Sequence, residues 1–569
     1  MSVPIGDLQA TFAATLVDEW VRAGVRDAVV CPGSRSTPLA LALVGRDELR
    51  VHVRLDERGA CFYALGLTMA SGMATVVCTT SGTAAAELHA GVVEASHARV
   101  PLIVCTCDRP PRLHHVGAPQ TIEQADLFGA AAVWRADPGL VHQGDQPWWR
   151  SLAARAVAES RSGPVHLNLA FEEPLLGTAG PLPPARNDGS GWQSSPGPAA
   201  TPPSPPGRWS RRGILVAGQG APADQVLRAA DVLGWPVLAD PRSGTRLDHP
   251  AVVAAADAIL RDEALAATLE PETIVLVGQP WVSRVLTEFV TRCARAGAHV
   301  AAVGPAPSDP GRVVSELHPG DAAAFFAAIA PAAAAPPSWR DRWERVEQAA
   351  QGAIVKVLEN DRLCAGGRAT EPGVARHLFA SVGSETSLFV SSSMPVRDLE
   401  WYGAPRSSPP VVRANRGVSG IDGVTSSALG LAAASRGPVV GLLGDLAFFH
   451  DVSALASVDD EAGSCTLVVL DNGGGGIFSF LPQAGALDPA RFERLFGTRP
   501  RASVVAVARG FGLPTAEAST LSDLDEALEQ FVGRESQAVV AVRVPGRDEN
   551  VALHDRLHDA VVAACREVG

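Results

Sequence analysis

Short apolar runs alternate with helical patterns along most of this 569-residue chain, and this alternation limits the folds that it can adopt. The runs recur at 27–31, 51–55, 75–79, 102–106 and 165–169, and again at 387–391, 439–443, 466–470 and 538–544. Strands that are apolar throughout are buried on both faces, and helices between them make them parallel. The sequence therefore predicts α/β domains whose parallel sheets are covered by helices.

Two breaks in composition divide the chain. The stretch 181–207 is rich in Pro, Gly and Ser, has almost nothing to bury, and is typical of an extended linker. A second boundary lies in the Ala- and Pro-rich stretch before residue 338, which precedes a predicted helix at 339–359. We therefore expect three α/β domains, at 1–180, 208–335 and 340–569, each of ordinary size.

Charge and cysteine content narrow the class of protein. With 48 basic and 61 acidic residues the net charge is −13, which argues against a nucleic-acid or anionic-membrane partner. No apolar stretch is long enough to insert into a membrane, and residues 1–14 lack the features of a secretion signal. Nine cysteines, most of them in apolar runs, suit reduced thiols in a cytoplasmic protein.

Two of the apolar runs end in residues that can bind a metal ion. Gly444 and Asp445 follow the run at 439–443, and Asn472 opens a glycine-rich loop after the run at 466–470. Oxygens of Asp445, the Asn472 side chain and the Gly474 carbonyl would suit a hard divalent cation, and glycines admit a diphosphate. Ordinary strand-to-loop turns contain the same residue types. Together, the two segments resemble the metal-diphosphate motif of thiamine-diphosphate enzymes, with departures at Leu446 and Gly473.

A second feature lies near the N-terminus. The strand predicted from 51 continues to Glu57, and a helical pattern begins at Arg58. A glutamate at a strand end is most often solvated, but this step resembles the site of the activating glutamate in thiamine-diphosphate enzymes. There a carboxyl beside the aminopyrimidine favours the imino tautomer, so that the coenzyme acts as its own base.

Several strings resemble one family of these enzymes, the 2-succinyl-5-enolpyruvyl-6-hydroxy-3-cyclohexene-1-carboxylate synthases (MenD). They are CPGSRSTPL at 31–39, DER at 56–58, TSGTA at 80–84, DRPP at 108–111, NRGVSGIDG at 415–423 and GIF at 476–478. The resemblance implies thiamine diphosphate with Mg²⁺ or Mn²⁺ as cofactors. It implies decarboxylation of 2-oxoglutarate and addition of the four-carbon product to isochorismate, in menaquinone biosynthesis. It also implies a homodimer or homotetramer with the active site between subunits.

The resemblance assigns roles to single positions, with Glu57 as the catalytic residue. The implied cofactor-binding residues are Glu57, Ser81, Gly82, Ser392, Ser393, Gly420, Ile421, Gly444, Asp445, Leu446, Ala447, Asn472, Gly474 and Ile477. The implied substrate-binding residues are Ser34, Arg35, Arg109, Gln120, Arg284, Arg397, Arg416, Ile477 and Phe478. The arginines suit substrates that carry several carboxylates. Pro119 stands where members of the family commonly have Asn, so the resemblance does not account for one substrate hydrogen bond. Ser392 stands where some relatives have Asn.

Three alternatives remain at this point. Another thiamine-diphosphate enzyme, such as an acetolactate synthase or a 2-oxoacid decarboxylase, would share the cofactor motifs but needs fewer arginines. A non-catalytic coenzyme-binding relative would not need to retain both Glu57 and Asp445. A dinucleotide oxidoreductase rests only on Gly218-Gln219-Gly220, which Pro222 and the missing third glycine weaken.

Overall fold

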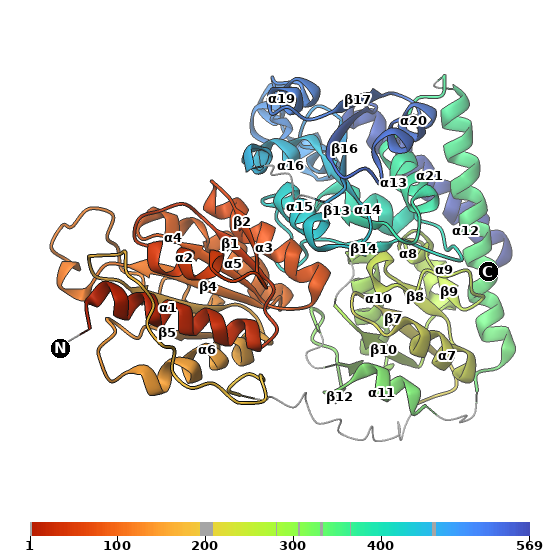
Figure 1. Ribbon diagram of the computed structural model, residues 1–569. Helices are drawn as coiled ribbons and strands as arrows, with labels where there is room; N and C mark the ends of the chain where they lie inside the picture. Colours follow the sequence, from red (N-terminus) through yellow and green to blue (C-terminus); the bar gives the residue numbers. More distant parts are fainter. Residues whose placement is uncertain are drawn as a thin grey trace.

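Three six-stranded parallel sheets, each flanked by helices, make up the part of the protein that the structure describes (Figure 1). The computed structural model describes residues 3–193, 209–279, 282–304, 308–329, 334–364, 366–457 and 463–569. The α/β fold with parallel sheets predicted from the apolar runs is confirmed. Of the predicted linker 181–207, residues 194–207 lie outside the described part, and 181–193 form no helix or strand. No helix in the described ranges is long and apolar enough to cross a membrane.

The first sheet has the strand order β2-β1-β3-β4-β6-β5. Its strands are β1 (Asp27–Val30), β2 (Arg50–Val53), β3 (Thr75–Thr79), β4 (Leu102–Asp108), β5 (Trp134–Ala136) and β6 (Val165–Ala170). Its helices are α1 (Ile5–Arg22), α2 (Thr37–Val44), α3 (Glu57–Ser71), α4 (Thr83–Glu87), α5 (His89–Ala98) and α6 (Gln146–Ser160). The prediction that the strand at 51 continues to Glu57 is wrong. The Asp56 side chain accepts a 3.1 Å hydrogen bond from the Gly59 N–H and caps α3, so Glu57 opens a helix.

The middle sheet has the order β12-β11-β10-β7-β8-β9. Its strands are β7 (Gly213–Ala217), β8 (Val237–Ala239), β9 (Val252–Val253), β10 (Thr273–Val277), β11 (His299–Val303) and β12 (Glu316–His318). Its helices are α7 (Ala223–Leu233), α8 (Ala256–Leu260), α9 (Glu263–Thr268), α10 (Arg284–Arg295) and α11 (Ala322–Ala327). A Cβ on Gly218 would lie 1.7 Å from the Gln279 carbonyl oxygen, so the close approach of two loops explains this glycine without a dinucleotide.

The third sheet has the order β14-β13-β15-β16-β18-β17. Its strands are β13 (Ser387–Val390), β14 (Val411–Arg413), β15 (Val439–Gly444), β16 (Cys465–Asp471), β17 (Thr515–Ala518) and β18 (Gln537–Arg543). The helices that follow the middle sheet are α12 (Pro337–Cys364), α13 (Glu371–Ser381), α14 (Met394–Tyr402), α15 (Val424–Ala434), α16 (Asp445–His450), α17 (Gln483–Ala486), α18 (Pro489–Phe492), α19 (Val504–Gly510), α20 (Leu521–Phe531) and α21 (Arg547–Val568).

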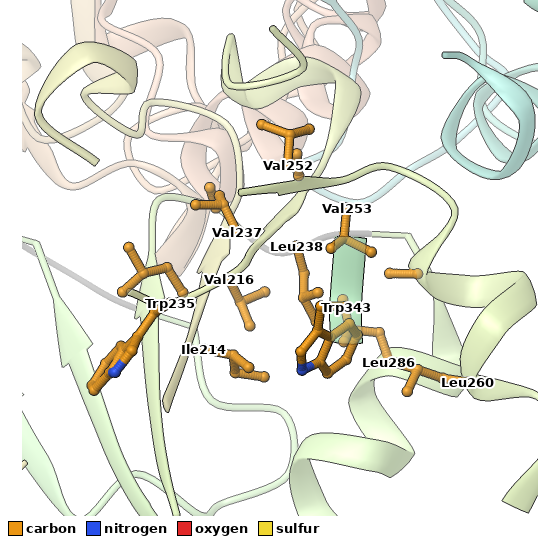
Figure 2. Packing of buried hydrophobic residues seen from close by; sticks show 14 of the residues in the cluster. Ile214, Val216, Trp235, Val237, Leu238, Val252, Val253, Leu260, Leu286 and Trp343 are labelled. Carbon is orange, nitrogen blue, oxygen red and sulfur yellow. The ribbon is translucent and has the colours of Figure 1, made fainter. Parts of the chain in front are cut away.

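Two helices of the C-terminal part complete the core of the middle sheet. Figure 2 shows Trp343 of α12 beside Leu238 and Leu286, and Leu557 of α21 belongs to the same buried cluster. The helix predicted at 339–359 thus exists as the longer α12, and it packs against the middle sheet as well as against α21. Burial of these large side chains fixes the middle and C-terminal parts to each other.

The first and third sheets are joined by α3 and α15, which cross at very close range. A Cβ on Gly66 would lie 2.1 Å from the Ser427 carbonyl oxygen, and one on Gly430 would lie 2.0 Å from that of Tyr63. Glycine at both positions therefore lets the two backbones touch. This contact places the Glu57 helix against the part of the chain that carries Asp445.

Candidate active site

A buried carboxyl of the site belongs to Asp445, the first residue of α16 behind β15. Only 2% of the residue is exposed. Oδ1 accepts a 2.6 Å hydrogen bond from the Leu446 N–H, and Oδ2 accepts one of 2.8 Å from the Gly474 N–H. Burial raises the pKa of Asp445 to about 6, because the carboxylate leaves water without a cationic partner. A bound cation would reverse that penalty.

The loop after β16 brings a second oxygen to Asp445. β15 and β16 are parallel neighbours with Gly444 opposite Leu470, so their carboxyl ends lie at the same edge. The Gly474 N–H also contacts Asn472 Oδ1 at 3.2 Å, and one donor therefore joins both side chains. Gly474 has φ +120°, and a Cβ there would lie 2.0 Å from the Gly497 carbonyl oxygen, so only glycine fits. This donor set fits an oxygen-liganded divalent cation.

A cavity of about 420 Å³ opens directly above these oxygens. Its walls include thirteen of the residues named from the sequence: Ser392, Ser393, Arg397, Arg416, Ile421, Gly444, Asp445, Leu446, Ala447, Asn472, Gly474, Ile477 and Phe478. Gly420 lies in the chain between two lining residues, Ser419 and Ile421. The space has the size of a small-molecule site and combines polar groups with apolar walls.

Two largely buried arginines face this cavity. Arg416 Nη1 lies 3.4 Å from Ser392 Oγ, and Arg397 Nη1 donates a 2.5 Å hydrogen bond to the Ser393 carbonyl. Among the ion pairs of the described residues, none involves either side chain. Burial, together with the charges of Arg242 and Arg397, lowers the pKa of Arg416 to about 10. An anionic ligand would relieve this repulsion.

A second polar group lies in the first domain, at the ends of β3 and β4. Arg109 donates hydrogen bonds to Ser81 Oγ and, at 2.7 Å, to the Gln120 carbonyl, and Gln120 Nε2 donates to the Ser81 carbonyl at 3.1 Å. The Gly82 N–H donates to Gln124 Oε1 at 2.9 Å. Burial, and then the charge of Arg35, lower the pKa of Arg109.

Four other residues named from the sequence lie around or away from this group. Arg35 is buried and donates to the Phe171 carbonyl at 2.9 Å, and Ser34 is exposed just before it. Arg284 does not join either group: its side chain is 89% exposed and pairs with Glu288 one turn along α10. Glu57 is half-buried, and burial, then the charges of Asp56 and Glu87, raise its pKa.

Within one chain, the polar group of the first domain and Glu57 do not line the cavity of the third domain. All described residues that line the cavity fall between Glu371 and Phe478, and Glu57 is not among them. The neighbours of Glu57 are instead held to the third domain of the same chain: Arg58 donates to the His450 carbonyl at 2.9 Å, and Ser453 Oγ donates to Asp56. The cavity therefore lacks a catalytic carboxyl from its own first domain.

Comparison with known proteins identifies the family of this fold and site. The thiamine pyrophosphate enzyme N-terminal TPP binding domain matches residues 10–127, the middle domain of thiamine pyrophosphate enzymes matches 207–390, and the C-terminal TPP binding domain matches 406–542. The 2-succinyl-5-enolpyruvyl-6-hydroxy-3-cyclohexene-1-carboxylate synthase of Thermobifida fusca is 40% identical, over 97% of this chain and 99% of its own length. The chain belongs to this synthase family.

Further relatives agree with that assignment. Proteins of the same name from Chloroflexus aurantiacus and Bacillus pumilus are 37% and 34% identical, each over 98% of this chain and over 97% and 98% of their own lengths. The chain is thus a thiamine-diphosphate-dependent enzyme, as the two sequence motifs predict. The family resemblance inferred from the sequence is confirmed.

No sequence motif predicts two further residues of the site. Glu371 lines the cavity and bonds to Asn472, and Glu94 of α5 bonds to the loop that carries Arg416. The Thr370 side chain accepts a hydrogen bond from the Gly373 N–H and caps α13. In the sequence, Glu371 is therefore typical of a first-turn glutamate in a capped helix. Neither position carries a local signal of its role, because its partner is distant in sequence.

Proposed function

We propose that this synthase decarboxylates 2-oxoglutarate and adds the resulting four-carbon unit to isochorismate, forming 2-succinyl-5-enolpyruvyl-6-hydroxy-3-cyclohexene-1-carboxylate and CO₂ for menaquinone biosynthesis. The observation that carries the proposal is the pair Arg397 and Arg416, which line the same cavity as Asp445 and Asn472 and are largely buried. Neither arginine forms an ion pair with a carboxylate of the described residues. Both substrates bring carboxylates, which the guanidinium fork binds in pairs of hydrogen bonds. Bound thiamine diphosphate supplies the nucleophilic carbon and the electron sink.

We infer that Mg²⁺ or Mn²⁺ binds Asp445, Asn472 Oδ1 and the Gly474 carbonyl. Supporting this, Asp445 and Asn472 already converge on one backbone N–H, and the cavity that the glycine loop lines leaves room for a diphosphate. Ile477 and Phe478 wall the same cavity and would exclude water from the reacting carbon. Ile421 lines the same cavity and would contact the coenzyme.

Glu57 is proposed as the group that holds a proton at the aminopyrimidine N1′. Its raised pKa favours a shared proton, as a general acid-base group requires. Since Glu57 does not line the cavity of its own chain, we infer a homodimer or homotetramer in which Glu57 of one subunit faces the Asp445 of another. Ser81, Gly82, Arg109 and Gln120 would enter the shared site with Glu57. The eight described cysteines, all buried and unpaired, support a reducing, cytoplasmic setting.

Mixing two inactive variants tests the shared site. Glu57→Gln and Asp445→Asn proteins, inactive alone, are unfolded together and refolded as mixed oligomers. A site built from two subunits restores about a quarter of the wild-type specific activity, because half of the dimers are mixed and each has one intact site. A site built within one chain restores nothing, and the shared-site proposal then fails.

The reaction itself is tested by isochorismate consumption. Purified protein receives isochorismate, 2-oxoglutarate, Mg²⁺ and thiamine diphosphate, and each of the last three is omitted in turn. Loss of isochorismate absorbance that requires all three supports the proposal. Release of CO₂ from 2-oxoglutarate with isochorismate untouched would show that the acceptor is different.

A further inference from the structure

Glu371 lies at the inner wall of the cavity, outside both motifs that the sequence offers for the cofactor. It is the first residue of α13, and Thr370 caps that helix. Only 1% of the residue is exposed. Its Oε1 accepts a 2.9 Å hydrogen bond from Asn472 Nδ2, across 101 positions of sequence. A carboxyl from a different element therefore contacts the amide that is proposed to bind the metal.

The orientation of the Asn472 amide follows from its two neighbours. The Gly474 N–H can only donate, so the amide atom at 3.2 Å from it must be the acceptor Oδ1. The NH₂ group must then point the other way, where Glu371 Oε1 receives it. The two contacts together turn the amide oxygen toward Asp445, and rotation of the amide would place two donors or two acceptors face to face.

Glu371 is itself fixed in place. Asn550 of α21, which is 2% exposed, donates a second hydrogen bond of 3.0 Å from Nδ2 to the same Oε1. On the loop side, a Cβ on Gly476 would lie 2.8 Å from Asn472 Nδ2, so the amide has little room to swing. The carboxyl thus connects the metal-binding loop to the C-terminal helix.

We propose that Glu371 is a positioning residue that holds Asn472 in the orientation required for divalent-cation binding. The inference rests on the proposed metal site and adds to it a residue from outside the metal motif. Partners that orient a ligand and polarise it contribute strongly to metal affinity, and their loss weakens binding by roughly ten- to a hundred-fold.

The test measures Mn²⁺ affinity of the full-length protein with thiamine diphosphate present, by the electron paramagnetic resonance signal of free Mn²⁺. Glu371→Met keeps the volume but removes the acceptor, and we expect a rise in Kd of roughly ten- to a hundred-fold. Glu371→Gln keeps an acceptor oxygen and is expected to retain most of the affinity. Equal affinity of wild type and Glu371→Met would overturn the proposal.

Two further variants separate this role from a general loss of structure. Asn550→Ala removes the other hydrogen bond of Glu371 but leaves the contact between Glu371 and Asn472, so its Mn²⁺ affinity should fall clearly less than that of Glu371→Met. A loss in Asn550→Ala as large as in Glu371→Met would assign Glu371 to the fold alone and overturn the proposal. Melting temperatures of the metal-free proteins, which should agree for the two variants, report any unfolding.

Asn472→Ala separates this inference from the metal site on which it rests. If Asn472→Ala binds Mn²⁺ as wild type does, the proposed metal site is wrong and the Glu371 inference falls with it. If Asn472→Ala loses affinity while Glu371→Met does not, only the Glu371 inference is wrong. The double variant Glu371→Met/Asn472→Ala should bind Mn²⁺ only slightly more weakly than Asn472→Ala, because both changes remove the same interaction.

Discussion

The carboxylate of Glu94 accepts a 2.6 Å hydrogen bond from the backbone N–H of Gly417. Its second oxygen accepts from the Val418 N–H at 2.7 Å. Glu94 belongs to α5 of the first domain and is 1% exposed, whereas the two N–H groups belong to the loop that carries Arg416 and Ile421. A Cβ on Gly417 would lie 2.4 Å from the Glu94 carbonyl oxygen, so helix and loop also touch directly. The first domain thus sets the position of a cavity wall in the third.

Replacing Glu94 should therefore weaken substrate use. Glu94→Ala leaves the Gly417 and Val418 N–H groups without their acceptor. Loss of charge-assisted bonds worth about 1.5–3 kcal/mol predicts a fall in kcat/KM of roughly ten- to a hundred-fold. Glu94→Gln offers one acceptor in place of two and should lie between Ala and wild type. Steady-state kinetics with varied 2-oxoglutarate measure this. A lower melting temperature with unchanged kcat/KM would limit Glu94 to a structural role.

Glu57→Gln should abolish most turnover and leave the fold intact. The amide keeps the shape of the side chain but cannot exchange a proton with the aminopyrimidine, which predicts a loss in kcat of roughly a hundred- to ten-thousand-fold. Turnover of isochorismate at saturating cofactor measures it, with Glu87→Gln as the control, since Glu87 is exposed and acts on Glu57 only through its charge. Near-normal kcat in Glu57→Gln would remove this residue from the mechanism.

Arg416→Ala and Arg109→Ala should each impair substrate use far more than coenzyme affinity. One charge-assisted contact is worth about 1.5–3 kcal/mol, or about one to two decades in kcat/KM. The matched control is Arg155→Ala on α6, an arginine whose side chain is 56% exposed and pairs with Glu159. Titration calorimetry with thiamine diphosphate gives the coenzyme affinity. Unchanged kcat/KM in either variant would make that arginine structural.

Asp451 should make the protein less stable as the pH rises from about 4 to about 6. Its carboxyl is fully buried, and burial raises its pKa from 3.8 to about 6. The folded state therefore holds the proton more tightly than the unfolded state, and this stabilisation, full below 3.8, is lost as the pH passes about 6. The effect is at most about 3 kcal/mol, from about 1.4 kcal/mol for each pKa unit.

Asp451→Asn removes this dependence, because the amide oxygen still accepts the 2.6 Å hydrogen bond from the Ser426 N–H without any charge. The melting temperature of Asp451→Asn relative to wild type should therefore rise between pH 4 and pH 7. Asp341→Asn, which changes an exposed carboxyl on α12, should show a constant difference. A constant difference for both variants would contradict the prediction.

Local sequence patterns predict the strands that are buried on both faces. The runs at 75–79 and 439–443 became β3 and β15 with at most one residue of difference, because continuous apolar residues and flanking turn residues mark a central strand. The apolar runs do not predict the edge strands β5 and β17. Their residues are mostly half-exposed, so they carry no continuous apolar run. The pattern at 51–57 predicts a strand that ends at Glu57, whereas the Asp56 cap starts α3 at that residue.

The sequence by itself determined the α/β class, the synthase family, and the chain positions of Asp445, Asn472 and the glycine loop, since each depends on residue types within a few positions of one another. Only the tertiary structure decided that Glu371 meets Asn472 and Glu94 meets Gly417, across 101 and 323 positions. It also decided that Glu57 stays outside the cavity of its own chain while its helix packs on α15. Such pairings depend on how whole sheets and helices bury their surfaces together, and no local pattern of side chains encodes that.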